Sequence, residues 1–200
     1  AAAYQVFRVA RELAAKGRVL LLVGKGGNGG DALYAGAELA LAGYRVDALL
    51  TAGRAQERAL AAFTNAGGQV LEALPDSAFE YALAIDGITG IGGSGGLREE
   101  LADVVRWLRR VRVLSVDVPS GIDADTGDGG ALHVTADATV TFGGWRRAHG
   151  LNPACGTQLV ADIGVGELML SASLENLIAE GQMGETLLLS ATRALPPDQE

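Results

Sequence analysis

The chain has 200 residues, of which 48% are hydrophobic and 20% charged, so it is expected to form one globular domain with a proper core and not a disordered segment. Its formal net charge of -8 argues against a protein that holds nucleic acid on a basic face. The single cysteine, Cys155, excludes an internal disulfide. Because no internal disulfide can form, a reducing compartment is the simpler expectation. The sequence shows no signal peptide and no apolar stretch long enough to span a membrane. We therefore expect a soluble, cytoplasmic protein with no membrane partner.

The first predicted elements are a helix, a strand, a glycine loop and a second helix. Apolar residues recur at helical spacing over residues 2–16. Residues 19–23 are continuously apolar, which is typical of a parallel strand covered on both faces. Five glycines follow within residues 24–30, and a helix continues to about residue 41. Free N–H groups and the dipole at the start of that helix favour a bound phosphate.

The glycine loop matches the dinucleotide-binding pattern Gly-x-Gly-x-x-Gly at Gly24, Gly26 and Gly29. That pattern also requires an acidic residue at the end of the next strand, about 20 residues further on. Asp47 has this separation, but it lies inside the predicted strand at residues 45–50. The ribose-binding part of the motif is therefore not predicted. A Walker loop is excluded because no Lys followed by Ser or Thr comes after the second glycine.

The rest of the chain alternates strands with helices. This alternation predicts a Rossmann-like, doubly wound three-layer α/β/α sandwich with a mostly parallel sheet. Further strands are expected at residues 45–50, 70–71, 81–86, 113–117, 138–142 and 158–163, and further helices at residues 56–65 and 97–110. We assign residues 1–166 to the domain and residues 167–200 to a C-terminal tail or linker, with helical-looking segments at residues 174–179 and 186–194.

Three predicted strands end in polar loops, and the carboxyl ends of parallel strands meet at one edge of a sheet. Asn28 and Asp31 follow the first strand, Asp86 ends the fourth, and Asp117 and Ser120 follow the fifth. A single aspartate is most often a satisfied loop residue, and helix capping is the alternative for Asp31. Three acids close together, however, need a cation or a shared proton between them. A hard cation with oxygen ligands and an acid–base pair both remain open from the residues alone.

Other motifs are weaker. A Gly-x-Ser-x-Gly sequence around Ser94 matches a hydrolase elbow, but Ser94 lies several residues beyond the strand end. The acidic run at residues 123–128 lacks the closing glutamate of a calcium loop. Cys155 has no histidine close to it in the sequence and is expected to be inert, and residues 145–149 are expected to form a surface turn.

Four segments together resemble the NAD(P)H-hydrate epimerases, the YjeF N-terminal domain family. They are Gly27-Asn-Gly-Gly-Asp31, Asp86 with its glycine loop, Ser115-Val-Asp-Val-Pro-Ser-Gly-Ile-Asp-Ala-Asp-Thr-Gly127, and Ala136-Asp-Ala-Thr-Val-Thr-Phe142. The resemblance covers about residues 2–164. It departs from the usual pattern at Gly27, where asparagine or aspartate is usual, and at Ala32, where glycine is common.

The resemblance implies an isomerase that interconverts the two epimers, at C6 of the nicotinamide ring, of hydrated NADH or NADPH, called NAD(P)HX, as a metabolite-repair reaction. It implies substrate contacts from Gly27, Asn28, Gly29, Gly30 and Asp31, from Gly90, Ile91, Gly92, Gly93, Ser94, Gly95 and Gly96, and from Asp117. It implies a potassium ion held by Asn28, Asp86 and Ser120. We expect Asp117, assisted by Asp31, to carry the protons that let hydroxide leave and water return.

The resemblance also implies a longer, bifunctional protein. Residues 187–197 resemble the linker that leads to an ATP- or ADP-dependent dehydratase domain in two-domain members, and the N-terminal helices usual in the family are expected to be missing before residue 1. The main alternative function is a non-catalytic nucleotide- or RNA-binding scaffold of the same fold, and the second is an NAD(P)-dependent oxidoreductase. The choice between NADHX and NADPHX, and the formation of a homo-oligomer, stay open.

Overall fold

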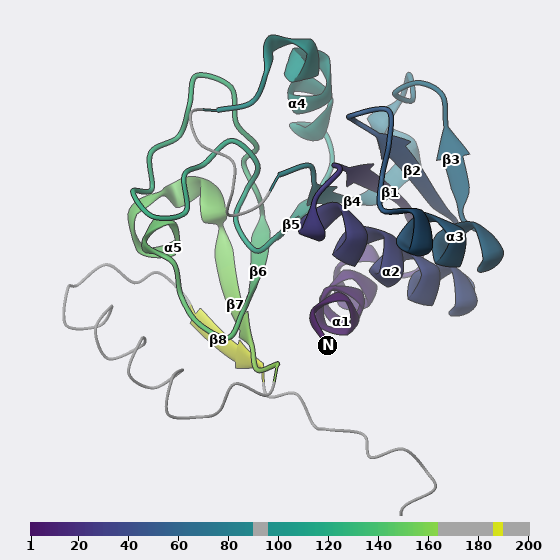
Figure 1. Cartoon of the computed structure of the whole chain (residues 1–200), viewed down its shortest axis with the longest axis horizontal. Coiled ribbons are helices and arrows are strands. Elements are labelled where there is room, and N and C mark those ends of the chain that lie inside the picture. Colours follow the sequence, from purple (N-terminus) through teal and green to yellow (C-terminus); the bar gives the residue numbers. More distant parts are fainter. Residues whose placement is uncertain (90–95, 164–185, 190–200) are drawn as a thin grey trace, which may run out of the picture.

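The structure is a computed structural model that describes residues 1–89, 96–163 and 186–189. These residues form a single eight-stranded sheet in the order β3-β2-β1-β4-β5-β6-β7-β8, and all neighbouring strands are parallel (Figure 1). The strands are β1 (Arg18–Val23), β2 (Val46–Leu50), β3 (Gln69–Leu71), β4 (Tyr81–Gly87), β5 (Val113–Val116), β6 (Ala138–Phe142), β7 (Thr157–Ala161) and β8 (Thr186–Leu189). The α-helices are α1 (Ala2–Ala14), α2 (Gly27–Leu41), α3 (Glu57–Asn65), α4 (Ala102–Leu108) and α5 (Arg147–Leu151), and short 3-10 turns are η1 (Ala78–Glu80), η2 (Glu99–Leu101) and η3 (Pro153–Cys155).

The strand order reverses between β1 and β4. From β1 the chain builds outward through β2 to β3, then returns to pair β4 with the other side of β1. In open parallel sheets, ligands bind outside the carboxyl ends of the strands at such a reversal. The glycine loop after β1 and the residues after β4 therefore stand where a ligand is expected.

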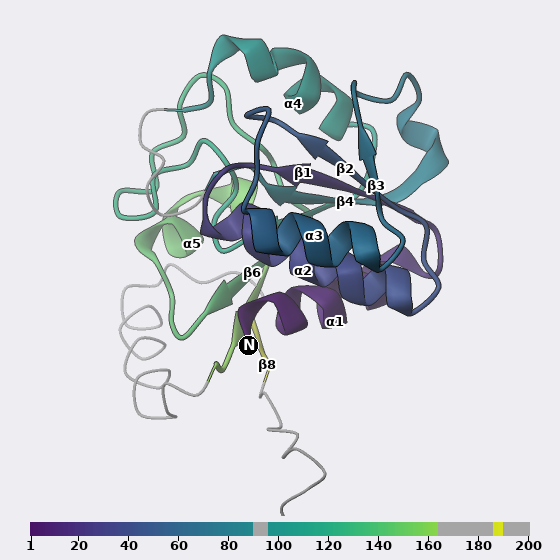
Figure 2. The same cartoon turned by 45° about the vertical axis from the view of Figure 1, so that its right-hand side comes forward.

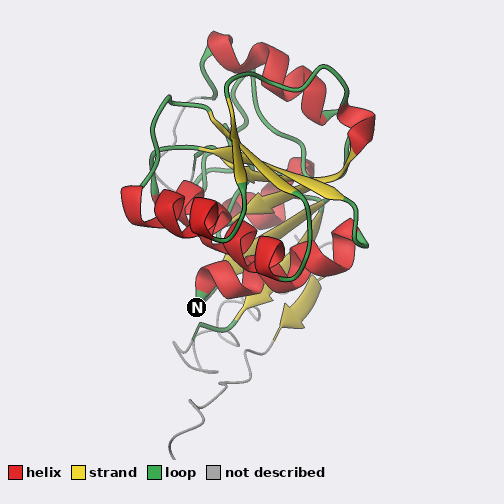
Figure 3. Cartoon of the chain, turned by 90° about the vertical axis from the view of Figure 1, so that its right-hand side faces the viewer, coloured by secondary structure: helices red, strands yellow, loops and turns green. Residues whose placement is uncertain are grey.

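Helices cover both faces of the sheet, as the alternating pattern predicts. Helices α1, α2 and α3 lie on one face and α4 lies on the other (Figures 2 and 3). Val19, Leu21 and Val23 pack into the core beneath α1, α2 and α3, whereas Leu20 and Leu22 belong to the core beneath α4. Burial on both faces is the physical reason for the uninterrupted apolar run in β1. The Rossmann-like α/β/α prediction is confirmed.

The tail prediction needs one correction. Thr186–Leu189 is not helical but forms β8, which pairs in parallel with β7 from Gln158↔Thr186 to Ala161↔Leu189. A short apolar run has no period that separates a strand from a helix, and here the free edge of β7 selects the strand. The segments at residues 174–179 and 190–194 lie outside the described residues, and the division at residue 166 stays a prediction. None of the described helices is both long and apolar enough to cross a bilayer.

Candidate functional site

The glycine loop connects β1 to the start of α2 and is closely packed at two of its glycines. A Cβ on Gly24 would lie 1.8 Å from the carbonyl oxygen of Ile88, and a Cβ on Gly29 would lie 2.1 Å from the carbonyl oxygen of Gly24. In contrast, a Cβ on Gly26 or Gly27 would meet no atom within 4 Å. The loop is therefore packed against the sheet on one side and open on the other, where the first amides of α2 can reach an anion.

Asp31 is not the cap of this helix. Helix α2 begins at Gly27 and its N-cap residue is Gly26 in an extended conformation, so Asp31 follows after a full turn. Burial raises the pKa of the Asp31 carboxyl, and the negative charge of Asp117 acts in the same direction, whereas the N-terminal amine and a hydrogen bond from the backbone of Ala3 oppose the rise. The capping alternative is therefore wrong, and the two acids predicted to carry protons are near enough to influence each other.

Asp86, near the end of β4, is completely buried, yet every side-chain oxygen has partners. Its Oδ1 accepts hydrogen bonds from the Ser120 hydroxyl at 2.6 Å and from the Ile88 amide at 3.3 Å. Its Oδ2 accepts from the Ser115 hydroxyl at 2.8 Å and from the Ser120 amide at 2.9 Å. Burial raises the pKa of Asp86, and these hydrogen bonds oppose that rise. Asp86 thus ties the end of β4 to the loop after β5.

Asn28, in the first turn of α2, completes this connection. Its side-chain amide donates to the carbonyl oxygen of Val116 at 2.6 Å and to that of Thr89 at 3.1 Å. The Thr89 amide in turn donates to the Ser120 hydroxyl at 2.9 Å. The structure therefore brings the predicted residues Asn28, Asp86 and Ser120 together, from three separate segments, in a network that is rich in oxygen atoms.

Asp117 follows β5 with a positive φ of 68°, a conformation that costs a non-glycine residue about 1–3 kcal/mol. Its amide donates to the carbonyl oxygen of Val140 at 2.7 Å, and its Oδ1 accepts from the Thr141 hydroxyl on β6 at 2.8 Å. The side chain is only 6% exposed. Neighbouring strand β6 therefore fixes both the backbone and the carboxylate of Asp117.

His149 holds the same residue from another direction. Its Nε2 lies 2.7 Å from the carbonyl oxygen of Asp117, and its Nδ1 accepts from the amide of Arg146 at 2.8 Å. These partners require the neutral ring with the proton on Nε2. Burial also lowers the pKa of His149, which favours the same neutral form.

The prediction of a surface turn at residues 145–149 is wrong. His149 is only 2% exposed and lies in α5, where its backbone carbonyl accepts a hydrogen bond from the side chain of Gln158. Sequence reasoning therefore missed His149 and Thr141 as neighbours of Asp117. The strand at residues 138–142 contains two threonines, Thr139 and Thr141, and only the nearness of Thr141 to the carboxyl end of the strand could have identified it.

Asp47 lies near the amino end of β2, away from the glycine loop and the acids described above. It is the second residue of β2, its carboxylate accepts from Arg18 Nε at 2.7 Å, and it accepts from the Tyr81 hydroxyl at 2.7 Å. This half-buried ion pair gives Asp47 a structural role at the amino ends of the strands, so it is no ribose ligand. Cys155 is buried, and burial raises the pKa of its thiol to about 12, in agreement with an inert residue.

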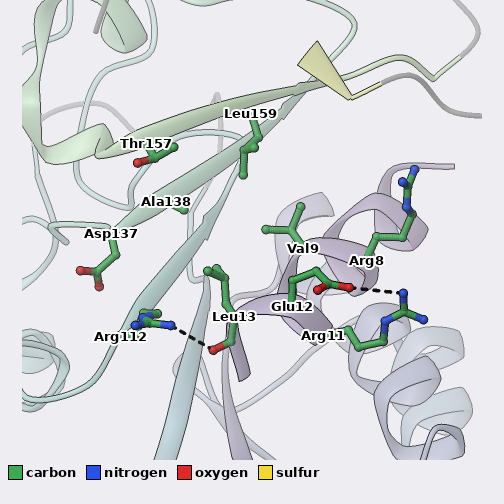
Figure 4. A pocket seen from close by; sticks show the side chains of 10 residues that line it. All are labelled: Arg8, Val9, Arg11, Glu12, Leu13, Arg112, Asp137, Ala138, Thr157 and Leu159. Atoms are coloured by element: carbon green, nitrogen blue, oxygen red, sulfur yellow. Dashed lines mark hydrogen bonds and ion pairs between the residues drawn. The ribbon is translucent and has the colours of Figure 1, made fainter. Parts of the chain in front are cut away.

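Two cavities differ in their relation to these acids. A cavity of about 510 Å³ is lined by Arg112, Asp137 and Thr157 at the amino ends of β5, β6 and β7 and by residues of α1 (Figure 4). A second cavity of about 450 Å³ lies outside the carboxyl ends of β1, β2 and β4, and is lined in part by Gly24 and Gly96. Only the second adjoins the glycine loop. Of the predicted second substrate loop, Gly90, Ile91, Gly92, Gly93, Ser94 and Gly95 lie outside the described residues.

Comparisons with known proteins agree with this fold. The crystal structure of yeast ynu0 superimposes with a TM-score of 0.64 at 20% identity, covering 98% of this chain and 78% of that one, which supports the fold. A bifunctional NAD(P)H-hydrate repair enzyme Nnr of Corynebacterium glutamicum is 46% identical over 81% of this chain, which spans 33% of that relative. An NAD(P)H-hydrate epimerase of Bordetella bronchiseptica is 38% identical over 94% of this chain and 85% of its own length. Residues 1–148 match the family described as YjeF-related protein N-terminus, and the chain therefore belongs to this family.

Proposed function

We propose that this chain is an isomerase that interconverts the epimers of hydrated NADH and NADPH at C6 of the nicotinamide ring. One observation carries the proposal: Asp117 and Asp31 lie close enough to interact electrostatically at the edge of the sheet where the amides of α2 are open to an anion. Phosphates bound at those amides would bring a dinucleotide to a pair of acids. The relatives named as epimerases support the same reaction.

The chemistry needs one proton donor and one acceptor. When the C6 hydroxyl is protonated, the C–O bond breaks, water leaves, and the lone pair of the ring nitrogen stabilises the cation that remains. Water then adds to the opposite face of C6 and loses a proton to a carboxylate. Asp31, whose pKa is raised by burial, is suited to give the proton, and Asp117 is suited to accept one through Oδ2, since its Oδ1 is held by Thr141.

We also propose that Asn28, Asp86 and Ser120 hold a potassium ion. The donor set fits a hard cation, because it consists of oxygen atoms: the carboxylate of Asp86, the hydroxyl of Ser120 and the side-chain carbonyl of Asn28. Asp86 is completely buried and forms no ion pair with any described residue, so its negative charge lacks a compensating cation. Bound potassium would supply that positive charge and hold together the loops after β1, β4 and β5.

The wider context is part of the proposal. The chain spans about a third of its Corynebacterium glutamicum relative, which is named as bifunctional. We infer that this chain is the epimerase part of a cytoplasmic protein with a linked dehydratase domain. The oxidoreductase alternative finds no support among these relatives, which are named as a hydrate repair enzyme and a hydrate epimerase. The scaffold alternative leaves the acid pair and the open amides without a role.

The test is direct conversion of a purified epimer. NADPHX enriched in one epimer is incubated with the protein, and the ratio of the two epimers is followed by chromatography. We expect the protein to speed the approach to equilibrium and Asp117→Asn to remove most of that acceleration. Asp125→Asn is the matched control, because it makes the same change at an exposed position eight residues further along the segment after β5 and should leave the rate unchanged. A fully active Asp117→Asn variant would contradict the assignment.

A further inference from the structure

We propose that the cavity beside the glycine loop binds the 2′-phosphate of the substrate's adenosine ribose, so that the chain prefers NADPHX to NADHX. This inference rests on the proposed function and names which of the two substrates the site is built for. Its starting point is charge. Lys25, Arg54 and Arg98 line the cavity, and none of the described residues that line it is acidic.

The absence of acids distinguishes these three cations, because the cavity of about 510 Å³ is also lined by three arginines, Arg8, Arg11 and Arg112, but has Glu12 and Asp137 beside them. Acidic residues outnumber basic ones, 24 to 16, so a basic cluster without an acid departs from the overall balance. Among the described residues, Lys25, Arg54 and Arg98 form no ion pair with any acidic side chain. Unpaired cations that line one concave surface attract a multiply charged anion, and a phosphate monoester carries nearly two negative charges at neutral pH.

The position of Arg54 identifies which phosphate. In dinucleotide-binding folds with the strand order seen here, the adenosine ribose lies at the end of the second strand, where an acid binds the 2′-hydroxyl or an arginine accommodates a 2′-phosphate. Arg54 follows β2 at that position, and the only acid of β2, Asp47, lies at the opposite end of the strand. The arrangement therefore resembles the phosphate-accepting version.

The segment that carries Arg54 is fixed to the glycine loop. The Thr51 amide donates to the carbonyl oxygen of Val23 at 2.9 Å, and its hydroxyl does so at 3.0 Å. The Gln56 side chain donates to the carbonyl oxygen of Gly26 at 3.3 Å. Arg54 thus lies between two anchors on the loop whose open amides would hold the pyrophosphate, and a single dinucleotide can reach both.

Arg98 lines the cavity from another part of the chain. It precedes η2, and its neighbour Leu97 donates its amide to the carbonyl oxygen of Leu132 at 2.8 Å, which ties this segment to the loop after β5. The cavity volume of about 450 Å³ lies within the usual range for small-molecule sites. Both Arg54 and Arg98 line this cavity, and a guanidinium group can bind a phosphate through two parallel hydrogen bonds.

The experiment measures binding without turnover. NADP+ and NAD+ are titrated into the protein by calorimetry at fixed ionic strength. We expect NADP+ to bind at least about tenfold more tightly than NAD+. Arg54→Gln and Arg98→Gln should each weaken NADP+ binding by about tenfold or more and leave NAD+ binding within about twofold. Arg58→Gln, an exposed arginine on the next helix, is the matched control and should change neither.

The outcomes separate this inference from the proposed function. Equal affinity for NADP+ and NAD+ would overturn the 2′-phosphate site, whatever the epimerase assay shows. Equal weakening of both nucleotides by Arg54→Gln and Arg98→Gln would also overturn it, because the cations would then contact the pyrophosphate. A preference for NADP+ that depends on Arg54 would support the site even if the chain fails to epimerise NADPHX. Arg54 is exposed, so unchanged thermal unfolding of its variant is expected and is checked first.

Discussion

Two glycine-to-alanine changes in the same loop should affect the free energy of unfolding in opposite ways. In Gly24→Ala, the new methyl group would lie 1.8 Å from the carbonyl oxygen of Ile88 and 2.7 Å from its carbonyl carbon. Both atoms belong to the backbone, so the loops after β1 and β4 would have to move apart. In Gly27→Ala, the methyl group would meet no atom within 4 Å, and the change would fall at the first residue of α2.

The expected sizes follow from these contacts. Alanine is more favourable than glycine in a helix by up to about 1 kcal/mol. In a chain of this size 1 kcal/mol corresponds to a Tm change of about 2–4 °C, so Gly27→Ala should leave Tm unchanged or raise it by a few degrees. Forcing a methyl group into packed backbone costs about 1–3 kcal/mol or more. Gly24→Ala should therefore lower Tm by about 2–12 °C.

For NADP+ binding we expect the opposite order, with Gly27→Ala the more damaging of the two changes. The methyl group of Gly27→Ala would occupy the space through which a phosphate approaches the amides of α2, so affinity for NADP+ should fall about tenfold although the protein is at least as stable. The assay combines thermal unfolding followed by circular dichroism with NADP+ titration of both variants. Undiminished NADP+ affinity in Gly27→Ala would refute the phosphate site, and an unchanged Tm in Gly24→Ala would refute the packed loop.

Three further tests concern Thr141, His149 and Cys155. Thr141→Val removes the hydroxyl that donates to the Asp117 carboxylate, so kcat for epimerisation should fall about tenfold or more while NADP+ affinity, measured by titration, stays the same. Burial lowers the pKa of His149 in the folded protein, so below about pH 6.5 the unfolded chain binds more protons than the folded one. The free energy of unfolding should therefore fall on acidification by up to about 1.4 kcal/mol per pH unit. Denaturant titrations at pH 7 and pH 5.5 should show a smaller fall for a His149→Gln variant. Cys155, buried and with its thiol pKa raised to about 12, should react with a thiol reagent only after unfolding, which absorbance with and without denaturant measures.

The parts of the molecule that the sequence could predict are those decided by local pattern. The apolar run of β1 predicts a strand buried on both faces, because each successive side chain points to an opposite face of the sheet. The acid of β4 and the polar loop after β5 follow from the same rule, since parallel strands bring their carboxyl ends to one edge. Asn28, Asp86 and Ser120 therefore came together as expected.

The errors arose where distant contacts decide the structure. The leucines of β8 adopt a strand because β7, almost thirty residues earlier, offers a free edge, and their local pattern fits either element. His149 is buried because Asp117, 32 residues earlier, and Gln158 both bond to it. Asp31 is a residue type that often caps helices, but Gly26 is the N-cap of α2 and Gly27 its first residue, so the helix begins a turn before Asp31.

The strained backbone at Asp117 explains why a neutral histidine is useful there. A positive φ persists in a non-glycine residue only when the surroundings hold it, and His149, Thr141 and Val140 each supply a hydrogen bond. A protonated ring could not accept the Arg146 amide at Nδ1, so burial and hydrogen bonding both keep His149 uncharged. A neutral donor fixes the backbone without placing a positive charge beside the Asp117 carboxylate. The negative charge of Asp117 therefore still acts on Asp31, where it adds to the effect of burial and opposes that of the N-terminal amine, and the proposed division of proton donation and acceptance between the two aspartates depends on a raised pKa at Asp31.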